Sequence, residues 1–591
     1  MVGGIDWVNS KVAESWVGRW FQLEGSGHPK ERAGSRFLTE LRAGVTTWAA
    51  MVYIISVNAN IVSDSGGPCV CPTDDLCLLD VEYLACVGDV RRDLITSTAA
   101  LSALSSFLIG LFANLPIGMA PGLSLNAYFA YSVVGFHGSG QISYQEALGA
   151  VFLEGWLFFI LSVMGLRQWL VRLMPRSLVL AVGAGIGLFI AFIGLSSAGL
   201  DVIGGDTSHY VGLGGCKPDA WMEGMPHFCQ DSGVLRSPTM WLGVFIGGLF
   251  TSLLMLYRVR GAILIGIFLT SIISWPRATP FTFFPYNTVG DDAFDFFKQV
   301  ATFRPLQRIG NVLEFNYTNG RVWYALITFL YVDILDTTGT MYSMAKFAGL
   351  CDPVTMDFEH STLAYCIDAI CISIGSLLGC SPTTAYIESA TGISEGGKTG
   401  ITGITVGLMM FISIFFAPIF ASIPPWATGG ALVIVGSLMI SNVRAINWAY
   451  PGDAIPAFLA VIIIPLSYNV AYGIIAGVLS YILLNSIAWG IAKASGDRIV
   501  PPGRSTSEDW FLPQGTFLPP WMHMVKDRYR DRKSSSDLKN GPIPLDSRDS
   551  HHDGPDSIAA TEVSSVEHEP GTQNRTNNLP LPKHRVGDKH R

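Results

Sequence analysis

Three acidic residues stand inside otherwise apolar segments of this 591-residue chain. Asp333 and Asp336 are three residues apart in Y-V-D-I-L-D-T-T-G-T, so on a helix they share a face. Glu388 follows in C-S-P-T-T-A-Y-I-E-S-A-T-G. Carboxylates from two helices that meet at a cavity can accept N–H donors from a solute and carry a proton. The alternative is a structural pairing, such as Asp336 capping a broken helix or bridging Lys346.

Other polar residues extend this pattern. Thr337 and Thr340 continue the polar side of the segment that carries Asp336. Asn126, in P-G-L-S-L-N-A-Y, offers both a donor and an acceptor, which suits the mixed edge of a heterocycle. A packing role, in which Asn126 bonds the other broken segment, is the alternative. Glu154 is a further acid in an apolar segment, and the sequence assigns it no role.

Glu388 and Asn126 both follow breaks in apolar segments. Pro121 to Tyr128 reads P-G-L-S-L-N-A-Y, and Pro382 to Tyr386 reads P-T-T-A-Y. Proline and glycine leave backbone groups unpaired, which a membrane tolerates only where the backbone is buried or lines a cavity. Broken segments at corresponding positions of two halves are typical of a transporter binding site. A simple proline kink is the alternative.

The composition indicates a membrane protein that crosses the bilayer many times. Hydrophobic residues make up 49% of the chain and charged residues 14%, against about 25% charged in an average soluble protein. Mean hydropathy is +0.39. We find no phosphate-binding loop, no His/Cys cluster with metal-ligand spacing and no basic patch with interleaved aromatics. We therefore expect no enzyme, no metal or other cofactor, and no nucleic-acid partner.

The apolar stretches predict an all-α protein with fourteen transmembrane segments in two groups of seven, a pattern that favours inverted repeats. The tenth is too short and too polar for an ordinary span. The segments lie near 38–62, 94–114, 117–136, 146–166, 177–197, 240–257, 261–275, 322–346, 361–379, 381–394, 399–420, 427–442, 453–469 and 472–493.

Charges in the loops predict that both termini are cytoplasmic, because short loops after even-numbered segments carry the arginines and lysines. The outer loops would hold Cys69, Cys71, Cys77 and Cys86, then Cys216 and Cys229, where disulfides are plausible and zinc is the weaker alternative. The predicted organisation is a cytoplasmic region, a first repeat, an extracellular loop, a second repeat and a disordered cytoplasmic tail, at 1–37, 38–275, 276–321, 322–493 and 494–591.

Five stretches resemble the AzgA-like purine transporters of the nucleobase–cation symporter superfamily, in their fungal branch. They are G-M-A-P-G-L-S-L-N-A-Y-F (118–129), F-L-Y-V-D-I-L-D-T-T-G-T (329–340), S-P-T-T-A-Y-I-E-S-A-T-G-I (381–393), G-G-K-T-G-I-T (396–402) and P-G-D-A-I-P-A-F-L (451–459). One departure is Lys398, where the family usually has arginine; lysine lacks the bidentate fork.

The resemblance implies intertwined inverted repeats divided into a core and a gate domain, with short strands in segments 3 and 10. It also implies symport of hypoxanthine, adenine and guanine with protons across the plasma membrane. By position, Glu388 and Asp333 would hold the N–H groups of the purine, Asn126 would brace or contact it, and Ser389 would lie in the same site. Asp336 and Thr337 would support the site or the proton path.

Other functions remain open at this point. The same architecture carries other nucleobases, such as uracil, xanthine or urate, and inorganic anions, although carboxylates disfavour an anion. A nutrient sensor that signals through 500–591 is a candidate of a different class. The partners we expect are the solute, the lipid bilayer and a second copy of the chain in a homodimer.

Overall fold

The computed structural model divides the chain into two compact units, Met1–His523 and Met524–Arg591. All the residues that it describes belong to the first unit, so most of the predicted tail lies outside them. The described residues are 2–70, 80–166, 175–196, 199–204, 212–213, 221–222, 225–229, 234–259, 261–351, 358–496, 498–499 and 501.

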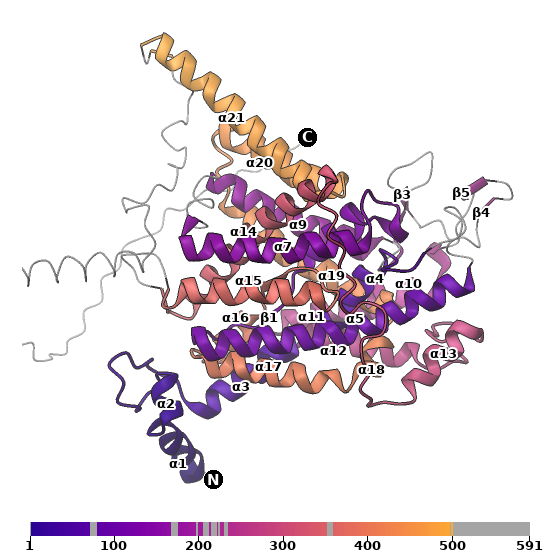
Figure 1. The fold of residues 1–591 in the computed structure, drawn as a ribbon, viewed down its shortest axis with the longest axis horizontal. Coiled ribbons are helices and arrows are strands. Elements are labelled where there is room, and N and C mark those ends of the chain that lie inside the picture. The colour runs from indigo at the N-terminus through magenta and orange to yellow at the C-terminus, as the bar shows by residue number, and fades with distance from the viewer. Residues whose placement is uncertain are drawn as a thin grey trace, which may run out of the picture. The chain divides into compact units, whose positions relative to one another are not determined.

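Helices dominate this part of the chain (Figure 1). The elements up to residue 275 are α1 (Val2–Ala13), α2 (Trp16–Trp20), α3 (Phe37–Met51), α4 (Ile54–Ser63), α5 (Val81–Leu108), η2 (Ile109–Ala113), β1 (Met119–Pro121), α6 (Leu123–Ala127), η3 (Tyr128–Val133), η4 (Phe136–Gly138), α7 (Tyr144–Met164), α9 (Arg176–Leu195), β2 (Ile203–Gly204), β3 (Gly212–Leu213), β4 (Trp221–Met222), β5 (Met225–Cys229), η6 (Val234–Arg236), α10 (Pro238–Leu242), η7 (Gly243–Phe250), α11 (Thr251–Leu256) and α12 (Ala262–Ser274).

The remaining elements begin with α13 in the predicted outer loop. They are α13 (Thr288–Phe297), α14 (Gly320–Phe347), α15 (Ser361–Leu377), β6 (Thr383–Ala385), α16 (Ser389–Ser394), α17 (Gly400–Ile414), α18 (Ala417–Ala421), α19 (Pro425–Met439), η8 (Ile440–Ala445), α20 (Pro451–Leu466) and α21 (Val470–Ala494). Each of the fourteen predicted segments contains a helix of the structure.

Seven helical stretches of the described chain are long and apolar enough to cross a membrane: Phe37–Ser63, Val81–Ala113, Tyr144–Met164, Arg176–Leu195, Pro238–Leu256, Pro425–Ala445 and Val470–Ala494. Four more apolar helices are shorter, namely α12, α15, α17 and α20. The sequence therefore correctly predicted a helical membrane protein.

The start of the second segment was wrong, because α5 begins at Val81 and not near residue 94. Asp80 caps its first turn by accepting hydrogen bonds from the N–H groups of Glu82 and Tyr83. The charged residues that follow made this stretch read as a loop. A disulfide joins Cys69 to Cys86 of α5, so two of the outer-loop cysteines, for which the sequence left disulfide formation open, are paired. Cys71, Cys77 and Cys216 lie outside the described residues.

The helices pack in two groups. The core group contains α3, α4, α5, β1, α6, η3, α7, α14, α15, β6, α16 and α17. In it, α5 packs against α17 and α4, and α7 packs against α15 and α14. Figure 1 shows α5, α7, α15 and α17 running in nearly the same direction. The gate group contains α9, α12, α19, η8, α20 and α21, with α9 against both α19 and α20. The names follow the division that the resemblance implied.

A two-stranded ladder joins the two halves of the chain inside the core group. Strand β1 pairs antiparallel with β6, with Met119 opposite Ala385 and Pro121 opposite Thr383. The N–H of Gly122 donates to the carbonyl of Pro382 at 2.9 Å, and the N–H of Tyr386 donates to Gly118 at 3.1 Å. These are the short strands that the resemblance implied for segments 3 and 10.

Side chains satisfy the outer edge of β1, which faces α5. The N–H of Met119 donates to Ser106 Oγ at 2.9 Å, and Ser106 Oγ is also 3.1 Å from the Met119 carbonyl oxygen. The N–H of Gly118 donates to Ser389 Oγ at 3.0 Å. All these residues are buried, so an unpaired backbone group would be costly here.

We predict that Ser106→Ala destabilises the protein by about 1–3 kcal/mol, because the buried N–H of Met119 loses its acceptor. The measurement is the melting temperature of the purified protein in detergent. Ser102→Ala is the matched control: Ser102 lies one turn earlier on α5, is fully buried, and its hydroxyl has no hydrogen-bond partner in the described chain. Equal melting temperatures for the two variants would show that the edge contact contributes nothing.

Candidate functional site

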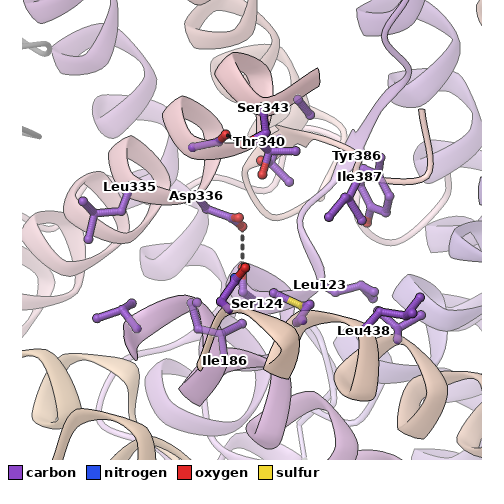
Figure 2. A pocket seen from close by; sticks show the side chains of 18 of the residues that line it. Leu123, Ser124, Ile186, Leu335, Asp336, Thr340, Ser343, Tyr386, Ile387 and Leu438 are labelled. Carbon is purple, nitrogen blue, oxygen red and sulfur yellow. Dashed lines mark hydrogen bonds between the residues drawn. The ribbon is translucent and has the colours of Figure 1, made fainter. Parts of the chain in front are cut away.

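A cavity of about 260 Å³ lies between the core group and the gate group. Its core-group wall comes from α6, β6, α14 and the start of α16, and its gate-group wall from α9, α19 and η8. Figure 2 shows side chains from both walls pointing toward one another. Its apolar lining includes Leu123, Val179, Val182, Ile186, Ile190, Val332, Leu335, Ile387, Val435, Leu438 and Met439.

Two carboxyl groups interrupt this apolar lining. Asp336 lies on α14 and accepts a hydrogen bond from Ser124 Oγ of α6 at 2.8 Å, the dashed line in Figure 2. Glu388 follows β6 at the start of α16, and its Oε1 accepts from the Tyr53 hydroxyl at 2.7 Å. Both side chains are only partly buried and line the cavity. No lysine, arginine or histidine is among the cavity-lining residues that the structure describes.

The ladder positions these groups. It fixes β6 against β1, so Ser124 and Glu388 are each held three residues beyond the end of a paired strand. Tyr386 braces the same turn, because its hydroxyl donates to the Pro121 carbonyl at 2.5 Å. Two chain segments far apart in sequence therefore present their polar groups at one wall.

The other predicted site residues lie behind this wall and do not line the cavity. Asn126 is fully buried and accepts a hydrogen bond from the Ser381 hydroxyl, so it bonds the opposite broken segment. The hydroxyl oxygen of Ser389 accepts a hydrogen bond from the N–H of Gly118. Asp333 is fully buried and accepts from the Thr337 hydroxyl at 2.8 Å. The structure thus brings Glu388 and Asp336 together at the cavity.

Asp336 has neither of the structural pairings considered for it from the sequence. Its partner is Ser124 on another segment, and no ion pair joins it to Lys346 within the described chain. It does not cap the broken helix α6 through that contact either, because the donor is the Ser124 hydroxyl and not a backbone N–H.

Sequence reasoning missed Ser124, Thr384 and Tyr53. Ser124 and Thr384 stand inside the two broken motifs, so their position in those motifs was a usable signal. Tyr53 lies between α3 and α4, and nothing in its local sequence marks it as a partner of Glu388.

The cavity opens at one end of the molecule and is closed at the other. Its open end has Ser343 of α14 and Asn442 of η8 in its lining. At the other end Tyr468, after α20, packs its ring against Tyr131 of the core group and against Phe189 and Phe192 of α9. The Ser132 hydroxyl also donates to the Tyr468 carbonyl, so both groups meet there.

The chain is similar to a known protein family and to several named proteins. Residues 38–476 match the model of a permease family, the xanthine/uracil permeases. A protein of Aspergillus versicolor named efflux pump notK' is 55% identical over 560 residues, covering 92% of this chain and 96% of that protein. A Schizosaccharomyces pombe protein with the provisional name xanthine/uracil permease C887.17 is 55% identical over 519 residues, 87% of this chain and 82% of its own length.

A bacterial relative is more distant. The guanine/hypoxanthine permease PbuO of Bacillus subtilis is 34% identical over 461 residues, covering 77% of this chain and 92% of the relative. The matched region contains every helix that lines the cavity. The chain belongs to the xanthine/uracil permease family and is a membrane transporter, not an enzyme.

Proposed function

We propose that this protein imports purine nucleobases, namely hypoxanthine, adenine and guanine, across the plasma membrane together with protons. The observation that carries the proposal is the presence of Glu388 and Asp336 on one small cavity with apolar walls. The proton gradient supplies the energy, and no cofactor is needed.

The cavity suits a purine in size and in chemistry. Its 260 Å³ lies near the lower end of the roughly 300–1,000 Å³ of small-molecule pockets. A purine is flat, with apolar faces for the walls and N–H donors along its edge for the carboxylates. An inorganic anion would need positive groups, which the described lining lacks. The name of the Bacillus subtilis relative, a guanine/hypoxanthine permease, supports the same solute class.

We further propose fourteen membrane segments in two inverted repeats of seven, at 38–275 and 322–493. The paired strands support this, because β1 and β6 lie in the third segment of each proposed half. The cavity then opens to the cytoplasm, since α14 and α19 end and α9 begins at the open end, beside Lys346, Arg444 and Arg176. Both termini are cytoplasmic in this arrangement. A homodimer remains part of the proposal.

Export by the same site is a second candidate, and the name of the Aspergillus versicolor relative favours it. A symporter runs in either direction according to its gradients, so direction needs its own test. Cells preloaded with labelled hypoxanthine would lose it faster with this protein if it is an exporter. Uracil, xanthine or urate as substrates, and a sensor that binds without transporting, are distinguished by competition and by net accumulation.

We predict that Glu388→Gln weakens hypoxanthine uptake, because the amide places N–H groups where the carboxylate accepted hydrogen bonds. Losing a charged acceptor costs about 2 kcal/mol, which is about thirtyfold in affinity. The measurement is saturable uptake of radiolabelled hypoxanthine in cells that lack their own purine carriers. Glu395→Gln, seven residues later and paired with Arg42 away from the cavity, is the control. Wild-type affinity in a surface-expressed Glu388→Gln would contradict the assignment.

We also predict that Ser343→Cys is labelled by a membrane-impermeant maleimide in inside-out vesicles and not in right-side-out vesicles. Ser343 is exposed at the open end of the cavity. Hypoxanthine should slow the labelling. Thr318→Cys, exposed on the predicted outer loop, should show the opposite sidedness. Labelling of both variants from the same side would overturn the proposed orientation.

A further inference from the structure

A third carboxyl group, that of Glu154, lies deeper in the core group and does not line the cavity. Glu154 is in the middle of α7 and fully buried. Neither of its carboxyl oxygens has a hydrogen-bond partner within the described chain. A buried ionised carboxylate without partners is strongly unfavourable, so this group must be neutralised in some way.

The groups that face Glu154 are themselves acidic. Its charge is repelled by those of Asp333 on α14 and Asp368 on α15, both of which are fully buried. The helices meet at this level: a Cβ on Gly155, the next residue, would lie 2.7 Å from the Ala369 carbonyl oxygen of α15. No basic group in the described chain forms an ion pair with Glu154.

A chain of hydroxyl groups connects this acidic cluster to the cavity. The Thr337 hydroxyl lies 2.8 Å from Asp333 Oδ1 and 3.1 Å from the Thr384 hydroxyl, and Thr384 lines the cavity. The neighbouring strand residue, Thr383, donates to Asp368 at 3.0 Å. Thr383 and Thr384 both belong to β6, the strand that holds Glu388 in place.

Three fully buried carboxylates whose charges repel one another are unfavourable when all are ionised, and binding one proton lowers the repulsion. The geometry favours a proton over a metal ion, because no three acidic, histidine or cysteine side chains of the described residues are arranged to hold a metal. A proton needs only a single oxygen.

We propose that Glu154 binds the coupling proton, which reaches it from the cavity through Thr384, Thr337 and Asp333. The proposal rests on the proposed function. The proton forms an O–H bond with a carboxyl oxygen of Glu154, and no electrons are exchanged. When Glu154 is ionised, its charge acts on Asp333 and Asp368. Asp368 accepts a hydrogen bond from Thr383 of β6, and Asp333 is linked to Thr384 of β6 through the Thr337 hydroxyl. The strand β6 therefore couples the protonation state of Glu154 to the position of Glu388.

The test compares Glu154→Gln with wild type in proteoliposomes that contain a pH-sensitive dye. Glutamine keeps the size of the side chain but cannot take up a proton. We expect hypoxanthine-driven proton entry and accumulation against a gradient to be lost, while exchange of labelled for unlabelled hypoxanthine continues. Thr337→Val should slow proton entry in the same assay and leave exchange intact. Glu146→Gln, half-buried in the first turn of the same helix and far from Glu154 along it, is the matched control and should behave as wild type.

The outcomes separate the two proposals. If wild type neither exchanges nor accumulates hypoxanthine, the proposed function fails. If wild type couples purine to protons and Glu154→Gln does so equally, with the same pH dependence, the assignment of Glu154 is overturned. Accumulation in wild type driven by a sodium gradient without proton movement would also overturn it. Loss of exchange in Glu154→Gln with normal amounts of folded protein would place Glu154 in solute binding and refute the proton role.

Discussion

The structure depends on the pairing of β1 with β6, because unpaired backbone cannot be buried in an apolar environment. Both segments are broken by proline and glycine, and each supplies the hydrogen bonds that the other lacks. Ser106 and Ser389 accept hydrogen bonds from the N–H groups of Met119 and Gly118, which the ladder leaves unpaired. The polar residues next to the strands can then face the cavity, since the backbone behind them is satisfied.

The cavity lies between the core and gate groups and not within either of them. A site at such a boundary changes shape when the groups move relative to each other, which is what alternating access requires. The aromatic contacts of Tyr468 close one end, so solute access at that end needs the two groups to separate. In the proposed function, the small size and mixed chemistry of the cavity select the solute, and its position between the two groups allows transport.

Much of this architecture could be predicted from the sequence, because hydropathy and the proline-glycine breaks are local signals. The sequence could not predict which carboxyl group lines the cavity. Asp333 and Asp336 share a face of α14, yet only Asp336 lines the cavity, since α14 is surrounded by neighbours on several sides. Ser389 and Asn126 carry the chemistry of ligands but satisfy the opposite broken segment. Only the three-dimensional partners distinguish these roles.

The ladder also sets an order of events during synthesis. Strand β1 emerges from the ribosome long before its partner: at about 5–20 residues per second, the roughly 260 intervening residues take on the order of 10–50 seconds. Throughout that time one edge of Met119–Pro121 has no strand beside it. A truncation before residue 383 would therefore deprive β1 permanently of its partner strand.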